Sequence, residues 1–314
     1  MDQFKQISTF VHVVQRGSLS AAARHEGIAP AMVSRRLDAL ESRLGVKLLQ
    51  RTTRRVSLTA EGSAFVEHCQ RILRELEDAE SAVAARSVEV TGQLRLTAPA
   101  GFGRQFIAPL VARFVETHPR VNVALDLSDR VVDVVAEGFD CAIRFGEHAD
   151  ASLVRIPLGA SRRVVVASPA FLARHRPRSI DDLTHLPCLA LAETGGSAAG
   201  SQRGWTLMQG SIPSVVRVGG TLSCNDGAVL HGWCLAGLGL AWRSMWEVSE
   251  DVAAGRLETV LDELAAPPVP VVGLLPARKH LPLRVRSFID FVKEAFQSPH
   301  VVAALGAPQR SGPR

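Results

Sequence analysis

The spacing of apolar residues divides the 314-residue chain into three parts. Up to about residue 59, apolar side chains recur at helical spacing in short segments, and one longer helical pattern follows over residues 60–90. Beyond residue 92, strand-like alternation takes turns with helical segments. We therefore expect a small helical domain (residues 1–59), a linker helix (60–90) and an α/β domain (91–296).

The first part predicts two short helices joined by a tight turn, over about residues 19–38. Ser18 or Ser20 can cap a first helix over residues 21–25, because a short side-chain oxygen satisfies amides of the first turn. Gly27 suits the turn, and Pro30 suits the start of the second helix, where its missing N–H costs nothing.

The second helix is expected to have one buried and one open face. Its buried stripe consists of residues spaced by four, three and four positions: Val33, Leu37, Leu40 and Leu44. On the other side, Ala31 is small enough to let the backbone approach a groove. Ser34 and Arg35 can donate to phosphates or base edges.

A basic hairpin follows, with strands expected at residues 45–49 and 54–58 and a polar tip at 50–53. Residues 35–55 hold seven Lys or Arg against two acidic residues, whereas residues 60–90 hold three against seven. Such concentrated positive charge favours DNA, whose bound counterions are released on contact. The residues expected to contact double-stranded DNA are Ser20, Pro30, Ala31, Met32, Ser34, Arg35, Arg36, Arg51, Thr52 and Arg54.

The linker helix carries a heptad seam, which is typical of a helix that pairs with a copy of itself. The seam is formed by Phe65, Cys69, Ile72, Leu76, Ala79 and Val83. We predict dimerisation through Phe65, Ile72, Leu76, Ala79 and Val83. The alternative is that the stripe packs on its own domain.

The α/β part predicts largely parallel sheets with helices on both faces. Strands are expected at residues 93–97, 121–127, 139–145, 163–167, 214–218, 238–242 and 269–275. Helices are expected at residues 106–117, 129–137, 169–175, 227–236 and 283–296, and residues 297–314 read as a disordered tail.

These motifs resemble a known family. The segments GSLSAAA and VSRRLDALESRLGVKLLQRTTRRVSLTAEG, after an amphipathic helix with Phe4, Ile7, Val11 and Val14 inward, resemble the winged helix-turn-helix of LysR-type transcriptional regulators. Many members have Ser or Thr where this chain has Ala29, so the second helix lacks that N-cap here.

The remainder resembles the effector-binding domain of the same family, and most closely the subgroup that contains CrgA and DmlR. The similarity is carried by LRLTAPAGFGRQFIAPL, GFDCAIRFGEHADASLVRIPLG and NDGAVLHGWCLAGLGLAW. It implies a two-lobed fold of the type 2 periplasmic-binding-protein kind, with lobe 1 at about residues 91–162 and 268–296 and lobe 2 at about 163–267. The chain is expected to pass between the lobes near residues 158–163 and 264–269.

The resemblance further implies how such a protein works. The linker helix pairs two DNA-reading heads on a pseudo-palindromic promoter site, as a dimer or a tetramer, with RNA polymerase as a further partner. An unidentified small-molecule effector binds between the lobes, at the carboxyl ends of strands.

We predict the effector site from residues at such strand ends: Pro99, Ala100, Gly101, Phe102, Gly103, Arg104, Ser128, Phe145, Gly146, Ser223, Cys224 and Asn225. Gly101 and Gly103 expose amides, and Arg104 adds a charge that would suit a carboxylate. The alternative is an ordinary strand-to-helix turn. Asn225 is also a candidate N-cap of the following helix.

The sequence lacks the motifs of an enzyme or a metal site: HExxH, Walker A, GxGxxG and CxxC are absent. We therefore expect a regulator without catalytic residues, metal or cofactor; the alternative is an enzyme on a periplasmic-binding-like fold fused to a DNA-binding head. A transport receptor is disfavoured, because the N-terminus does not read as a secretory signal. The net charge of +5 is moderate for a DNA-binding protein. The five cysteines are scattered and suit a protein of the reducing cytoplasm, and Cys224 with Cys234 is the pair that a peroxide switch would use.

Overall fold

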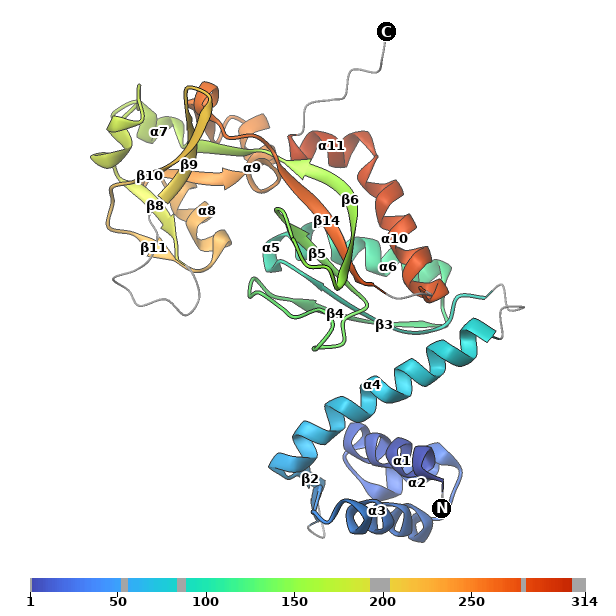
Figure 1. The fold of residues 1–314 in the computed structure, drawn as a ribbon. Helices are drawn as coiled ribbons and strands as arrows, with labels where there is room; N and C mark the ends of the chain where they lie inside the picture. Colours follow the sequence, from blue (N-terminus) through green and yellow to red (C-terminus); the bar gives the residue numbers. More distant parts are fainter. Residues whose placement is uncertain (1, 52–55, 84–88, 193–203, 278–280, 307–314) are drawn as a thin grey trace. The chain divides into compact units, whose positions relative to one another are not determined.

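The computed structural model describes residues 2–51, 56–83, 89–192, 204–277 and 281–306 (Figure 1). The chain forms two compact units, Met1–Val88 and Glu89–Arg314. Within the described residues, no helix is long and apolar enough to cross a membrane.

The first unit contains helices α1 (Gln3–Arg16), α2 (Leu19–Glu26), α3 (Pro30–Leu44) and α4 (Ala60–Val83) and the hairpin of β1 (Leu49–Arg51) and β2 (Val56–Leu58). Its core contains Phe10, Val13, Leu37 and Leu40, all at 0% exposure. The expectation that Phe4 points inward is wrong, since its side chain is 49% exposed. The buried face of α1 runs through Gln6, Thr9, Phe10 and Val13, and Phe4 lies in the first turn, off that face.

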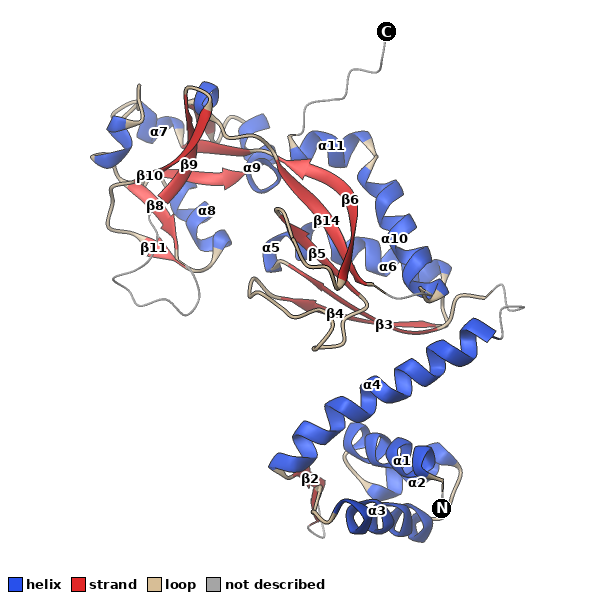
Figure 2. Cartoon of the chain, in the orientation of Figure 1, coloured by secondary structure: helices blue, strands red, loops and turns tan. Residues whose placement is uncertain are grey.

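Two five-stranded sheets organise the second unit (Figure 2). The first sheet has the order β4-β3-β5-β14-β6, from β3 (Gly92–Ala98), β4 (Val121–Leu127), β5 (Cys141–Phe145), β6 (Leu153–Ser161) and β14 (Val269–Pro276). The second has the order β11-β8-β12-β7-β13, from β7 (Arg163–Ala167), β8 (Cys188–Leu191), β11 (Ser223–Cys224), β12 (Leu240–Ser244) and β13 (Glu258–Val260). The chain passes from the first sheet to the second between β6 and β7 and returns before β14.

Both sheets are mixed, which corrects the expectation of largely parallel sheets. In the first, β3 runs parallel to β4 and β5, whereas β14 pairs antiparallel with β5 and β6. In the second, β8 runs parallel to β11 and β12, and β7 is antiparallel to β12 and β13. The antiparallel pairs involve the strands next to the crossovers, where the chain enters a sheet without a connecting helix.

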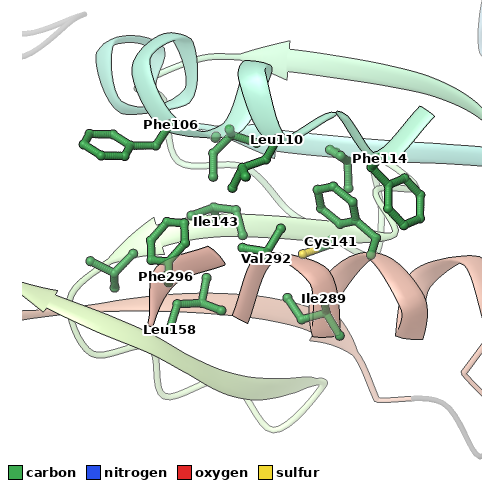
Figure 3. Close-up of a cluster of buried hydrophobic side chains, with 14 of the residues drawn as sticks. Phe106, Leu110, Phe114, Cys141, Ile143, Leu158, Ile289, Val292 and Phe296 are labelled. Carbon is green, nitrogen blue, oxygen red and sulfur yellow. The ribbon is translucent and has the colours of Figure 1, made fainter. Parts of the chain in front are cut away.

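Helices cover the sheets. On the first sheet these are α5 (Ala100–Phe102), the π-helix η1 (Gly103–Ile107), α6 (Ala108–Thr117), α10 (Leu283–Phe296) and α11 (Pro299–Leu305). The helices of the second sheet are α7 (Pro169–Leu172), η2 (Asp181–Thr184), α8 (Gly227–Leu235), α9 (Met245–Ala253) and η3 (Asp262–Leu264). Figure 3 shows the core between the first sheet and its helices, where Phe114 and Val292 are fully buried.

Two predicted elements of the α/β domain differ from the structure. The segment expected as a strand at residues 214–218 is β10 (Ile212–Arg217), which forms a separate hairpin with β9 (Gly204–Gln209). The helix expected at residues 129–137 is an irregular segment with turns. There Asp133 Oδ1 accepts from the Ala136 amide and Glu137 Oε1 from the Asp133 amide, so side chains replace the helical acceptors.

The expectation of a disordered tail from residue 297 is also wrong in part. Ser298 Oγ caps α11 by accepting from the Val301 amide, and Leu305 is buried at 1% exposure. Residues 307–314 lie outside the described part of the chain.

Candidate functional site

The helix-turn-helix forms as its caps predict. Ser18 Oγ accepts from the Ala21 amide at 3.1 Å and begins α2, and Gly27 ends α2 with a φ of 65°. Helix α3 starts at Pro30 after Ala29, which provides no side-chain cap. The missing cap expected from Ala29 is therefore confirmed.

Helix α3 separates a buried from an exposed face. Val33, Leu37 and Leu40 are at 0% exposure. Most of the predicted DNA-contacting residues of this region are exposed, namely Ser20, Pro30, Ala31, Met32 and Arg35, and Ser34 is half-buried. The exposed face can thus approach a DNA groove while the other face holds the domain together.

Arg36 has a different role from the one predicted. Its Nη1 donates to Glu26 Oε2 at 2.7 Å and to Thr9 Oγ1 at 3.0 Å, and its side chain is 17% exposed. The second carboxylate oxygen of Glu26, Oε1, lies 2.9 Å from His12 Nδ1. Arg36 therefore connects α1, α2 and α3. Its guanidinium is paired and only 17% of its side chain is exposed, which favours this structural role over the predicted DNA contact.

The hairpin is anchored by a buried carboxylate on α3 that sequence analysis missed. Glu41 Oε1 accepts from the amides of Leu48 and Leu49 at 3.0 and 3.2 Å, and Oε2 accepts from Lys47 Nζ at 2.7 Å. Burial raises the pKa of Glu41, but these hydrogen bonds outweigh it and hold the pKa below its ordinary value. Arg51 ends β1, while Thr52 and Arg54 lie outside the described residues.

The apolar stripe of α4 divides between two environments. Cys69 is at 0% exposure in the core of its own unit, and Phe65 packs against Phe10 with ring centroids 5.8 Å apart. Ile72 is 42% exposed, and Leu76 is half-buried. The alternative of packing on the same domain therefore applies to Phe65 and Cys69. The side chains of Ala79 and Val83 are outside the described part of the structure.

The predicted effector turn on the first sheet contains both core and surface residues. Pro99 N-caps α5, and the Ala100 amide donates to Asp129 Oδ1 at 2.9 Å. Phe102 is fully buried, which corrects its assignment as a ligand contact. Gly103 is also buried, since an added Cβ would lie 2.3 Å from Leu127 Cδ2. Arg104 is exposed.

Ser128, Phe145 and Gly146 lie at carboxyl ends of β4 and β5, where they are half-buried. Phe145 contacts the rings of Phe102 and Trp246, with centroids 4.8 and 6.4 Å away. Gly146 has a φ of 95°, a conformation that favours glycine.

On the second sheet, Ser223, Cys224 and Asn225 lead from β11 into α8. Asp226, rather than Asn225, is the N-cap, because its Oδ1 accepts from the Ala228 and Val229 amides at 2.7 and 3.1 Å. The candidate cap at Asn225 is thus wrong by one residue, which leaves its exposed amide free of that task.

The thiols are mostly buried. Burial raises the pKa of Cys69 to about 11 and that of Cys141, Cys188 and Cys234 to about 12. Cys234 donates to Val166 O at 3.5 Å, and Cys224 is half-buried. Because the thiolate is the reactive form, the burial of Cys234 argues against its use with Cys224 as a peroxide switch. No cluster of potential metal ligands occurs among the described residues.

A shallow cavity of about 430 Å³ lies at the crossovers between the sheets, and none of the predicted effector residues lines it. Its lining is Arg162, Met208, Asp262, Ala265, Ala266, Pro267, Pro268 and Gly306. Two of these lining residues form an ion pair, in which Arg162 Nη2 donates to Asp262 Oδ1 at 2.6 Å.

Comparison with known proteins decides the family. Residues 4–63 match the family described as bacterial regulatory helix-turn-helix protein, lysR family, and residues 87–297 match the LysR substrate binding domain. The chain belongs to the LysR family. It is 36% identical to the HTH-type transcriptional regulator DmlR of Escherichia coli over 291 residues, 92% of this chain and 93% of that protein.

Solved structures of LysR-type regulators agree over nearly the whole chain. CrgA of Neisseria meningitidis matches with a TM-score of 0.60 and 33% identity, over 94% of this chain and 99% of CrgA. The full-length virulence activator AphB of Vibrio cholerae matches with a TM-score of 0.58 and 26% identity, over 93% and 98% of the two chains. The predicted family, its subgroup and the architecture are confirmed. The protein is an effector-controlled, DNA-binding transcriptional regulator and not an enzyme.

Proposed function

We propose that the exposed face of α3 reads DNA in the major groove, while the β1–β2 hairpin contacts the backbone beside it. The contrast between neighbouring arginines carries this proposal: Arg35 is exposed on α3, whereas Arg36 is held inside by Glu26 and Thr9. Contacts to base edges are then assigned to Ala31, Ser34 and Arg35, and contacts to phosphates to residues 51–54.

We further infer that two copies act together on a pseudo-palindromic promoter site through Ile72 and Leu76 of α4, the exposed and half-buried members of the stripe. A regulator that acts on promoter DNA is expected to work in the cytoplasm, with RNA polymerase as a further partner.

A gel-shift titration with the DNA upstream of the protein's own gene tests the DNA assignment. The affinity is expected to fall as salt rises, because phosphate contacts release counterions. Arg51→Ala and Arg54→Ala should each weaken binding on every sequence and reduce the salt slope by about one. Unchanged affinity and slope in both variants would refute the hairpin contact.

We propose that the effector is a small molecule bound between the Gly101 turn, with Arg104, Ser128 and Phe145, and the 223–225 segment. The exposed guanidinium of Arg104 and the half-buried ring of Phe145 suit an anionic or aromatic compound. A thermal-shift screen of small organic acids and aromatics is the first test, since binding to the folded state raises the melting temperature. Hits whose shift is unaffected by Arg104→Ala and Ser128→Ala would place the site elsewhere, with the cavity at Arg162 as the next place to examine.

A further inference from the structure

The first turn of α9 joins the two halves of the effector domain. Trp246 lies in this turn and belongs to the core of the first sheet, where it is 6% exposed. Two residues further, Val248 is fully buried in the core of the second sheet. One short stretch of helix thus contributes side chains to both cores.

Trp246 packs into an aromatic socket beneath the Gly101 turn. Its ring contacts Phe102, Phe106 and Phe145, with centroids 5.2, 6.1 and 6.4 Å away. A Cβ added to Gly101 would lie 3.2 Å from Trp246 Cη2, so the helix start rests directly on the indole. Gln105 Nε2, in the π-helix, donates to Trp246 O at 3.3 Å.

On the other side, the end of β12, braced by the first turn of α9, supports the start of α8. Arg243 is 4% exposed, and its Nη2 donates to Gly227 O at 3.0 Å and to Glu247 Oε1 at 2.8 Å. Glu247 Oε2 accepts from the Ser244 amide at 3.2 Å in a capping box that fixes the first turn of α9. Gly227 leaves no spare room, since an added Cβ would lie 2.5 Å from Arg243 Nη2.

The side chains of Trp246, in the first turn of α9, and Arg243, near the end of β12, are held despite a cost. Trp246 Nε1 and Arg243 Nε are buried donors with no hydrogen-bond partner in the described part of the structure. An unpaired buried donor destabilises the folded state, and Phe would fill the aromatic socket without that loss. The packing and the ion pair must therefore outweigh it.

We propose that Trp246 and Arg243 are positioning residues of the effector site, which couple the Gly101 turn of the first sheet to the Gly227 turn of the second through α9. This inference rests on the proposed function in so far as the two turns form the two sides of that site. A movement of one turn on ligand binding is then transmitted to the other turn through the protein as well as through the ligand.

Hydrogen exchange of the full-length protein without ligand or DNA tests the coupling, and so it does not depend on the effector being known. The reporters are amides with defined acceptors: Ala100 beside Asp129, and Ala228 and Val229 on Asp226. Trp246→Ala and Arg243→Met should each raise exchange at least tenfold at both sets of amides.

Phe288→Ala is the matched control, because Phe288 is fully buried in the same core as Trp246 and packs on Phe114. It should raise exchange around the first sheet and leave Ala228 and Val229 as in the wild type. If Trp246→Ala does not fold, Trp246→Phe should give a smaller rise at both turns. A rise at only the near turn in the Trp246 and Arg243 variants overturns the coupling. Coupled exchange in variants that keep the wild-type thermal shift with a stabilising compound would overturn only the proposed effector site.

Discussion

At the residue scale, two adjacent arginines of α3 do different work. Arg35 and Arg36 are chemically identical, but the helix turns the second toward α1 and α2, where its Nη1 donates hydrogen bonds to Thr9 and Glu26. The first remains exposed. Their contributions to DNA recognition and to folding should therefore separate by mutation.

Arg35→Ala should change the sequence preference in a binding-site selection, with a loss of about 1–3 kcal/mol at the contacted base, and leave the melting temperature unchanged. Arg36→Ala should instead lower the free energy of unfolding by about 1–3 kcal/mol, because Glu26 loses its buried partner. Denaturant unfolding and gel shifts on both variants check this. Equal effects of the two substitutions in both assays would contradict the assignment.

Glu41 predicts a pH dependence of the first unit. Its folded pKa is lowered, since the hydrogen bonds from Lys47, Leu48 and Leu49 outweigh desolvation by burial. A lowered carboxyl pKa stabilises the fold above the ordinary value of 4.5, and that contribution disappears as pH falls through the folded pKa.

Thermal unfolding of the wild type and Glu41→Gln between pH 3 and about 7 measures this contribution. The wild type should be more stable at neutral pH, and the difference should shrink below about pH 4.5. Glu67→Gln, at an exposed position on α4 of the same unit, is the control for the removal of a carboxylate. A difference that stays constant across the pH range would mean that Glu41 does not anchor the hairpin.

At the element scale, α4 serves both its own domain and, by our proposal, a second copy. Its first turns pack Val66 and Cys69 into the core, while Ile72 remains 42% exposed two turns after Phe65. An apolar side chain left in water beyond the core is consistent with a partner helix.

The double variant Ile72→Asp/Leu76→Asp should lose the dimer in light scattering, because two charges would be buried in the seam at a cost of several kcal/mol. Binding to a two-half-site operator should weaken with it. Ala64→Asp, exposed on the same helix, supplies a matched charge and should leave the mass unchanged. An unchanged mass in the double variant would show that α4 does not mediate assembly.

At the scale of the whole molecule, the units Met1–Val88 and Glu89–Arg314 each have their own core. Damage to the effector domain should therefore leave the DNA-binding unit folded. The Gly101 turn is the place to test this, because an added side chain there would press on Trp246.

Gly101→Val should abolish the thermal shift with any compound that stabilises the wild type, while the affinity for DNA without effector stays within about twofold. Gly232→Ala, where an added Cβ meets nothing within 4 Å, should retain both properties. A Gly101→Val protein that still responds to the compound would move the effector site away from this turn.

The sequence alone determined the local elements. The Ser18 cap and the apolar stripe of α3 fix helices through neighbours a few residues away, so periodicity and cap chemistry suffice to predict them. The DNA-binding head was predicted for the same reason, since its charge and its helix-turn-helix lie in one short stretch of chain.

Only the tertiary structure decided which side chains of different elements contact one another. Arg36 was assigned to DNA because its partners Thr9 and Glu26 lie 27 and 10 residues away in the sequence. Phe102 was assigned to a ligand site because nothing in its neighbouring sequence indicates the contact that buries it. That contact is with Trp246 of α9, a helix more than 140 residues further along the chain. Long-range packing selects among chemically possible roles for a residue, and a linear pattern does not contain that choice.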